Sequence, residues 1–237
     1  MILPPSPAKR VPRVRKHLSA DALYASLRSG FGEILDHRGR ESPISLADAL
    51  MSGVAMFSLK DPSLLAFDGR RNDDNMRNLF GITRVPSDTQ MREILDPVDP
   101  QHIRPAFDNV FSKLQRGKAL ESFVFHQGCY LLSLDGTGYF SSSSIHCDCC
   151  LEKTNKQTEE VTYHHQMLAA VIVHPDHREV IPLAPEPIQK QDGSDKNDCE
   201  RNAAKRLLRR IRKEHPHLKL IVVEDGLASN GPQAASW

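Results

Sequence analysis

The fold is decided by the stretch Leu131-Leu132-Ser133-Leu134-Asp135-Gly136-Thr137, an apolar run that ends in a carboxylate and a glycine. The β-forming character of the run predicts a strand. A second run, Ile221-Val222-Val223-Glu224-Asp225-Gly226, has the same ending. Ligands collect at the carboxyl ends of strands in α/β sheets, so two neighbouring strands would project Asp135 and Asp225 into one crevice. Alternatively, each Asp-Gly pair is an ordinary turn that follows a strand.

The segment between these two runs predicts further strands and one helix. Residues 161–173 are β-rich and residues 179–183 follow after a turn, so the first three strands form a meander. Asp198 is the expected N-cap of a helix that Pro216 ends. The apolar stripe on one face of this helix is formed by Ala204, Leu207, Leu208 and Ile211. Three strands, a helix and a final strand predict an α/β domain.

The chain before about residue 125 has the pattern of helices. Four apolar residues recur at four-residue spacing, as on one helix face, and these are Leu23, Leu27, Phe31 and Leu35. Ser45, followed by Asp48, predicts a helix start with a capping acid. A helix that ends near Phe80, the turn Gly81–Pro86 and a helix from Ser87 together predict a helix-turn-helix, for which an ordinary helical hairpin is the alternative.

The charge distribution, rather than the total, indicates a polyanionic partner. The formal net charge is only +1, but residues 1–40 carry eight basic against three acidic residues, and residues 201–219 carry eight against one. The first 16 residues hold four prolines and five of these basic residues, which predicts a flexible basic arm over residues 1–18. Basic faces of this kind bind nucleic acid or are simply solvated. The candidate DNA contacts are Lys9, Arg10, Arg13, Arg15 and Lys16 in the arm and Lys205, Arg209 and Arg212 on the helix.

The composition excludes several classes of protein. Hydrophobic residues make up 39% and charged residues 26%, as in a folded globular chain. No apolar run approaches the roughly 20 residues that a membrane span needs, and no apolar stretch follows the basic N-terminus as in a secretory signal. Five cysteines, an odd number, argue against a disulfide scaffold and predict a reducing, cytoplasmic compartment.

A cluster of cysteine and histidine, His146-Cys147-Asp148-Cys149-Cys150, is a candidate zinc site. Cys147 and Cys150 have the two-residue spacing of a zinc knuckle, and His164 and His165 follow 14 and 15 positions beyond Cys150. Adjacent histidines on a strand face opposite ways, so at most one can join. The expected ligands are Cys147, Cys150 and His164, with a fourth from Cys149, His146 or Cys199. The alternative is a set of reduced thiols in a hairpin loop.

Several motifs together have the order and spacing of one protein family. They are Leu134-Asp135-Gly136-Thr137-Gly138-Tyr139-Phe140, Val85-Pro86-Ser87-Asp88-Thr89-Gln90, Tyr163-His164-His165-Gln166, Val180-Ile181-Pro182-Leu183, Asp192-Gly193, Asp198-Cys199-Glu200, Ala203-Ala204-Lys205-Arg206 and Val222-Val223-Glu224-Asp225-Gly226-Leu227. From about residue 40 to residue 232, the chain resembles the DDE transposases of bacterial insertion sequences.

This resemblance implies a ribonuclease-H-like fold in which three carboxylates hold Mg²⁺ as a pair of ions. Asp135 and Asp225 match the first two carboxylates. The third is expected to be a Glu on a later helix, and the 12 residues after Asp225 contain none. The family cleaves phosphodiesters at element ends with a metal-bound water and joins the freed 3′-hydroxyl to target DNA. It implies DNA as partner, a bacterial nucleoid-associated location and a homo-oligomer in the intact protein.

The sequence therefore predicts a helical DNA-binding region over residues 19–125, followed by an incomplete ribonuclease-H-like mixed-sheet α/β domain over residues 128–237. The expected function is that of a C-terminally truncated transposase in DNA transposition and recombination, inactive as this fragment because the third carboxylate is missing. One alternative is a non-catalytic DNA-binding remnant. A second alternative is a zinc-stabilised interaction module in which the two carboxylates only form turns.

Overall fold

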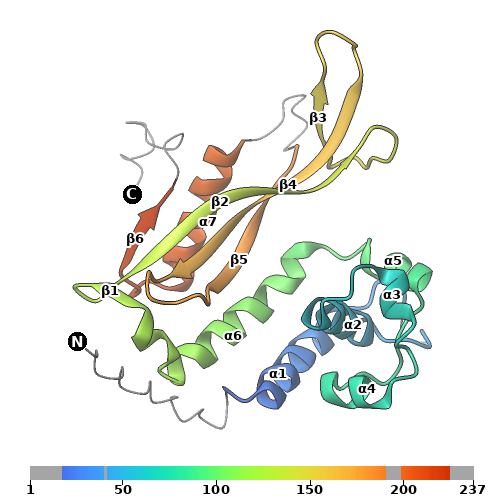
Figure 1. Cartoon of the computed structure of the whole chain (residues 1–237), viewed down its shortest axis with the longest axis horizontal. Helices are drawn as coiled ribbons and strands as arrows, with labels where there is room; N and C mark the ends of the chain where they lie inside the picture. The colour runs from blue at the N-terminus through green and yellow to red at the C-terminus, as the bar shows by residue number, and fades with distance from the viewer. Residues whose placement is uncertain (1–17, 40–41, 191–198, 225–237) are drawn as a thin grey trace, which may run out of the picture. The chain divides into compact units, whose positions relative to one another are not determined.

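The computed structural model describes residues 18–39, 42–190 and 199–224. The chain forms two compact units, with the boundary between Lys118 and Ala119. The first unit is helical, and the second contains a sheet and one long helix (Figure 1). The class is therefore mixed α/β, with N-terminal helices before the sheet, as the sequence predicts at this level of detail.

The first unit is built from short helices around one apolar core. The helices are α1 (Ala20–Gly32), α2 (Leu46–Leu59), α3 (Leu64–Asp68), α4 (Asp74–Phe80), α5 (Asp88–Leu95), the 3-10 helix η2 (Pro100–Ile103) and α6 (Arg104–Arg116). Its core includes Phe31, Met51, Phe67, Phe80, Met91 and Ile94, all buried. The rings of Tyr24 in α1 and Phe80 in α4 lie 4.6 Å apart between centroids, which joins the two helices. Burial of these aromatic and aliphatic side chains, rather than intrinsic helix propensity, stabilises helices this short.

Side-chain caps set where the helices of this unit begin. Ser45 accepts from the backbone N–H of Asp48 at the start of α2, and Ser87 forms a capping box with Gln90 at the start of α5. Both starts are as predicted. The prediction for Leu35 is wrong, because α1 ends at Gly32 and the Leu35 side chain is 88% exposed.

The second unit contains a six-stranded, mostly antiparallel sheet. Its elements are the 3-10 helix η3 (Ala119–Phe123), β1 (Val124–His126), β2 (Cys129–Ser142), β3 (Leu151–Thr154), β4 (Val161–Val173), β5 (Ile181–Ile188), α7 (Glu200–Glu214) and β6 (Leu220–Val223). Strand β4 pairs with β2, β3 and β5, while β2 also pairs with β1 and β6. All pairs are antiparallel except β2–β6. Across the sheet, the strands therefore run in the order β5-β4-β2-β6.

Strand β2 is longer than the sequence predicts. It continues through Asp135 and Gly136 to Ser142, so the Asp-Gly pair neither ends a strand nor forms a turn. The prediction that the strand ends at Asp135 and the alternative that Asp135-Gly136 forms a turn are both wrong, for the same reason. The 13-residue strand β4 provides hydrogen-bonding partners along this whole length, from Leu131↔Val173 to Ser142↔Tyr163. Backbone groups that find such partners stay in the ladder.

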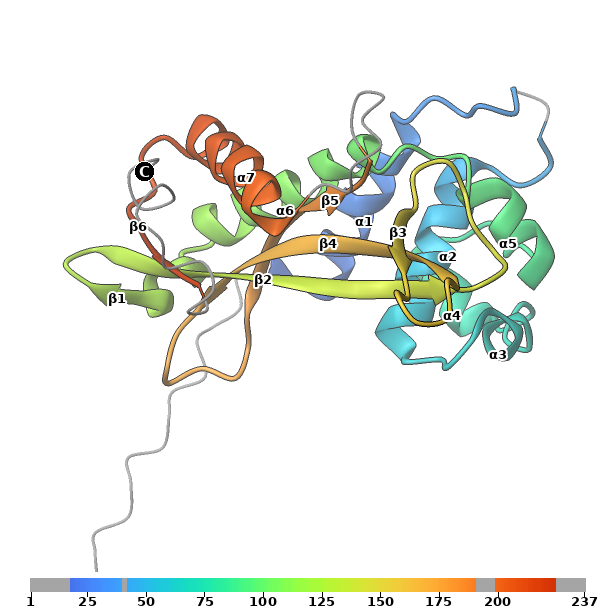
Figure 2. The same cartoon turned by 90° about the horizontal axis from the view of Figure 1, so that it is seen from above.

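Helix α7 covers one face of the sheet, and Figure 2 shows it lying across β4 and β5. The buried residues Ala204, Leu207 and Ile211 confirm the predicted apolar stripe. The N-cap is Cys199, and Asp198, the expected cap, lies outside the described residues. Strand β5 holds three prolines within Ile181–Ile188, which an edge strand tolerates because only one side needs N–H donors. In the described parts of the chain, no helix is long and apolar enough to span a membrane.

Candidate functional site

Asp135 lies on the sheet face opposite α7. Its neighbours in β2, Leu132 and Leu134, are buried on the α7 side. Side chains alternate along a strand, so Asp135 shares the other face with Leu131 and Ser133. Its side chain is exposed. A carboxylate in this position can meet a ligand from solvent without displacing core side chains.

Strand β6, which precedes Asp225 in the sequence, is the parallel neighbour of β2. The register pairs Leu131 with Ile221 and Ser133 with Val223. The condition set in the sequence analysis, that these two strands are neighbours, is therefore met. Asp225 itself lies outside the described residues. Ile221 and Val223 face away from α7 and are 37% and 43% exposed, so β6 is accessible on this face of the sheet.

No group of three potential metal ligands surrounds Asp135 in the described residues. An acid does pack against the next residue, Gly136, and it is Glu200 in the first turn of α7. A Cβ atom built on Gly136 would lie 2.0 Å from Glu200 Oε1, so the glutamate side chain rests directly on the glycine. Gly136 faces the α7 side, whereas Asp135 faces the other side. In the sequence, Glu200 is part of a motif but no contact is predicted for it, because its contact with β2 depends on how α7 packs.

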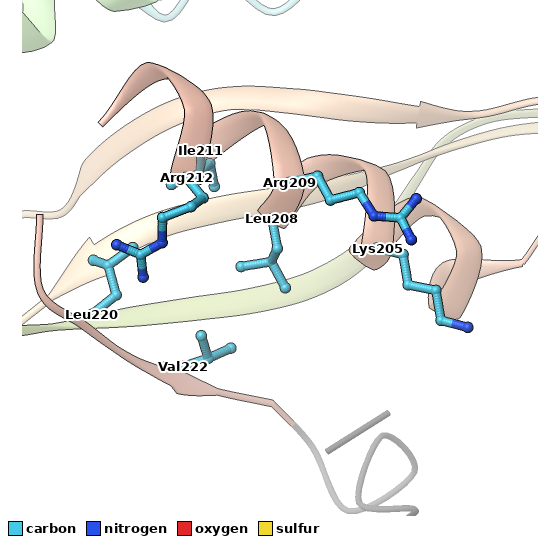
Figure 3. A pocket seen from close by; sticks show the side chains of 7 residues that line it. All are labelled: Lys205, Leu208, Arg209, Ile211, Arg212, Leu220 and Val222. Atoms are coloured by element: carbon cyan, nitrogen blue, oxygen red, sulfur yellow. The ribbon is translucent and has the colours of Figure 1, made fainter. Parts of the chain in front are cut away.

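A basic groove lies between α7 and β6. It has a volume of about 330 Å³ and is lined by Lys205, Leu208, Arg209, Ile211, Arg212, Leu220 and Val222. Figure 3 shows the apolar side chains of Leu208 and Val222 between the two elements, with the three cations around them. Lys205, Arg209 and Arg212, the predicted DNA contacts on this helix, therefore share one groove. Arg212 Nη1 also donates to the carbonyl oxygen of Leu218 over 3.1 Å, which fixes its guanidinium near β6.

Two further arginines of α7 have a structural role. Arg206 Nε lies 2.9 Å from Glu186 Oε1, and Arg210 Nη1 lies 2.8 Å from Glu186 Oε2. Glu186 is on β5 and is 7% exposed. Charges this deeply buried need such partners, so the two ion pairs tie α7 to β5. The basic character of residues 201–219 is thus divided between a groove and a buried ionic link.

Cys147, Cys150 and His165 form a cluster of potential metal ligands within the second unit. The two Sγ atoms are 3.7 Å apart, and His165 Nε2 lies 3.4 Å from Cys147 Sγ and 3.3 Å from Cys150 Sγ. Two thiols and an imidazole with converging donor atoms could hold a metal ion such as zinc. The cluster joins the loop between β2 and β3 to the middle of β4.

The histidine of this cluster differs from the prediction. His165 is the ligand candidate, and His164 is not part of the cluster. The two side chains lie on opposite faces of β4, as expected of neighbours, but the sequence could not say which face receives the cysteines. Of the three candidates for a fourth ligand, Cys149 and Cys199 are exposed free thiols. His146 stacks on Tyr163 with ring centroids 4.3 Å apart, and none of the three belongs to the cluster.

Burial changes the acid–base properties of the cluster. It raises the pKa of the Cys150 thiol; the hydrogen bond from the backbone N–H of Cys147 opposes this increase, and the Cys147 thiol adds to it. Burial also lowers the pKa of His165, as does the neighbouring His164. The pKa of Tyr139, whose ring stacks on His165 with centroids 5.8 Å apart, is raised by burial and by the two cysteines. Each shift favours the uncharged form of the group in the metal-free protein.

In the first unit, the segment that resembles a helix-turn-helix is held by one buried acid. Asp48 accepts from the backbone N–H groups of Thr83 and Arg84, over 3.0 Å and 3.3 Å, and pairs with Arg28 Nη1 at 2.8 Å. The sequence predicts that Asp48 is the capping acid of its own helix, and this prediction is wrong. Its carboxylate instead fixes the turn between α4 and α5. Lys9, Arg10, Arg13, Arg15 and Lys16, the predicted contacts of the arm, lie outside the described residues.

The comparisons with known proteins found no similar protein. No family model matches the chain, and neither a curated protein nor a solved structure is significantly similar to it. The class is therefore defined by the structure alone, as helices followed by a mostly antiparallel sheet that one helix covers.

Proposed function

We propose that this chain belongs to a DNA strand transferase of the DDE type, and that it contains the helical DNA-binding region and the first part of the catalytic sheet. The observation that carries the proposal is the parallel pairing of β2 with β6. Asp135 and Asp225 each stand two residues after the paired residues Ser133 and Val223, so a continued register would set the two carboxylates side by side. An antiparallel meander followed by a helix and a parallel strand is the arrangement expected of a ribonuclease-H-like sheet.

The metal of such an enzyme is Mg²⁺, and the donors present suit it in kind. Mg²⁺ prefers oxygen ligands and is usually held by one or two carboxylates together with phosphate oxygens and water. Asp135 offers an exposed carboxylate on the sheet face opposite α7, and Asp225 is its expected partner. When bound, Mg²⁺ supplies activation of a water or hydroxyl nucleophile and stabilisation of the leaving oxygen. The part of Asp135 is to hold the ion at the end of the β2–β6 ladder.

The remaining features supply DNA binding. Lys205, Arg209 and Arg212 present three cations around one groove, where they can contact successive phosphates. The turn between α4 and α5, fixed by Asp48, positions α5 as a helix that can meet DNA. The arm over residues 1–18 adds five cations. These contacts position the duplex and require no metal.

Binding of labelled duplexes, measured by fluorescence anisotropy in EDTA, tests the proposal. One duplex carries the inverted ends of the DNA that flanks the coding sequence, and the control duplex has the same composition in shuffled order. We expect at least about tenfold tighter binding of the end duplex, which corresponds to about 1.4 kcal/mol. Equal affinity for both duplexes, or none at low salt, contradicts the proposal and favours the zinc-stabilised interaction module.

The role of Asp135 in holding a metal ion is tested separately from DNA binding. Asp135→Asn should leave affinity for DNA in EDTA unchanged and remove any increase of affinity that Mg²⁺ or Mn²⁺ produces. Specific binding of end DNA without any metal effect favours the alternative of a DNA-binding protein without catalysis.

A further inference from the structure

We propose that Cys147, Cys150 and His165 bind one Zn²⁺ ion, with a water molecule as fourth ligand, and that this ion fastens the β2–β3 loop to β4. The site lies apart from Asp135 and is independent of the proposed catalysis. Each of its three residues belongs to the second unit, so the site is complete within that unit.

The distances between the donor atoms match those in a tetrahedral zinc site. Zn–S bonds of about 2.3 Å and a Zn–N bond of about 2.0 Å, at the tetrahedral angle, place two sulfurs about 3.8 Å apart and a sulfur and a nitrogen about 3.5 Å apart. The observed separations are 3.7 Å between the sulfurs and 3.4 Å and 3.3 Å from sulfur to nitrogen. One ion can therefore reach all three atoms with little movement of the side chains.

The backbone of the β2–β3 loop holds the two thiols in place. The N–H of Cys150 donates to the carbonyl oxygen of Cys147 over 3.1 Å, which closes a tight turn. The N–H of Cys147 in turn lies 3.3 Å from Cys150 Sγ and can donate to it. Such a hydrogen bond stabilises a thiolate, the form that binds metal. The turn thus presents both sulfurs on the side that faces β4.

The surroundings of the histidine fix the third ligand. A bulge between Gly138 and Phe140 in β2 inserts Tyr139, and the rings of Tyr139 and Phe140 lie 5.8 Å and 5.6 Å from the ring of His165. These contacts restrict rotation of the imidazole while Nε2 faces the two sulfurs. A ligand whose ring is already fixed loses little conformational entropy when the metal binds.

The chemistry of the donors favours zinc over hard cations such as Mg²⁺ and Ca²⁺. Two thiolates and one imidazole suit a soft or borderline cation, whereas Mg²⁺ requires oxygen ligands. Binding replaces the two thiol protons, which pass to the solvent, with bonds from sulfur to zinc. In the described residues, no fourth Cys, His, Asp or Glu atom lies within 4.8 Å of the three. Cys150 is buried but Cys147 is exposed, so the remaining position opens to water.

The position of the cluster indicates what the ion would stabilise. At His164 and Tyr163, β4 is paired with β2 on one side and β3 on the other. The loop that links these two outer strands, residues 143–150, has Cys150 as its only buried residue. An ion at this point connects the loop directly to the central strand. It would therefore order the loop and the β3–β4 hairpin without contacting α7 or β6.

Metal content of the purified full-length chain, prepared under reducing conditions with added Zn²⁺ and measured by mass spectrometry, tests this site. We expect about one Zn²⁺ per chain. Cys147→Ser and His165→Ala should lose it. The neighbouring residues provide matched controls, because Cys149→Ser and His164→Ala change the same residue types one or two positions away and should retain the ion. Circular dichroism shows whether each variant is folded.

Replacement of zinc by Co²⁺ gives a readout that does not depend on stability. The wild-type protein should show absorption from thiolate-to-cobalt charge transfer, about half as intense in Cys147→Ser if that variant retains Co²⁺. Loss of zinc from Cys149→Ser would contradict the proposal that the fourth ligand is water, because it would make Cys149 a ligand. A wild-type chain that takes up neither ion, or a folded His165→Ala variant that keeps a full equivalent, would overturn the site.

Discussion

Asp48 is the single residue on which the turn between α4 and α5 most depends. Its side chain is 5% exposed, accepts from two backbone N–H groups and pairs with Arg28. Removal of one partner from such a buried ionic group leaves the others without compensation. Asp48→Ala should therefore lower the free energy of unfolding by roughly 3 kcal/mol. Urea denaturation followed by circular dichroism measures this change.

The exposed ion pair of Asp74 with Arg77 provides a control in the same unit. Asp74 is 75% exposed, and surface pairs of this type contribute less than about 1 kcal/mol. Asp74→Ala should thus change stability little. If the two variants lose the same free energy, then Asp48 is not a specific tether of the turn.

Asp36 predicts a dependence of stability on pH. Hydrogen bonds from the Arg38 side chain hold the pKa of the Asp36 carboxyl below its usual value of 3.8, and its desolvation opposes them. A carboxyl with a lowered pKa stabilises the fold above the unfolded pKa, and this contribution is lost as pH falls through the folded pKa. Asp36→Asn should cost about 1 kcal/mol near neutral pH. In urea titrations the cost should decrease as pH falls below 3.8 and through the lowered pKa of the folded state, and a cost independent of pH would contradict this assignment.

At the scale of elements, α7 is attached to the sheet by the pairs of Glu186 with Arg206 and Arg210. All three side chains are largely buried, with 9%, 28% and 13% exposure. Glu186→Ala removes the buried carboxylate that both guanidinium groups share, although Arg210 keeps Glu214 at 3.8 Å, and should lower the free energy of unfolding by about 3 kcal/mol. Asp176→Ala, which removes an 87% exposed carboxylate from the same unit, is the matched control. Equal midpoints of thermal unfolding in the two variants would show that α7 is held by its apolar stripe alone.

Element starts were predictable from the sequence where the signal is local. Ser45 and Ser87 begin helices because a cap needs only residues within three positions. The length of β2 was not predictable, because it depends on pairing with β4, about 30 residues away. The same distinction holds for the metal cluster. Local spacing identified Cys147 and Cys150, but the choice of His165 over His164 is set by which face of β4 meets the loop.

The whole chain has almost no net charge, so any binding of DNA must come from local clusters of cations. The formal charge is +1, yet five basic residues lie in the first 16 and three line the groove beside α7. Counterion release makes the affinity fall with salt, with a log–log slope of about −0.9 for each phosphate neutralised. Contact by both clusters predicts a steep slope despite the small total charge.

Deletion of residues 1–17 removes the cations of the arm and leaves those of the groove, so it measures the contribution of each cluster to DNA binding. If all five cations of the arm contact phosphates, the deletion should reduce the slope by about 4.5 units, because each contact contributes about 0.9. Arg209→Ala in the groove should reduce it by about one unit, whereas Lys213→Ala, an exposed cation of α7 outside the groove, should leave it unchanged. Anisotropy titrations over a range of salt concentrations give the three slopes. Equal slopes for the full chain and the deletion would exclude the arm from the interface, and equal effects of Arg209→Ala and Lys213→Ala would exclude the groove.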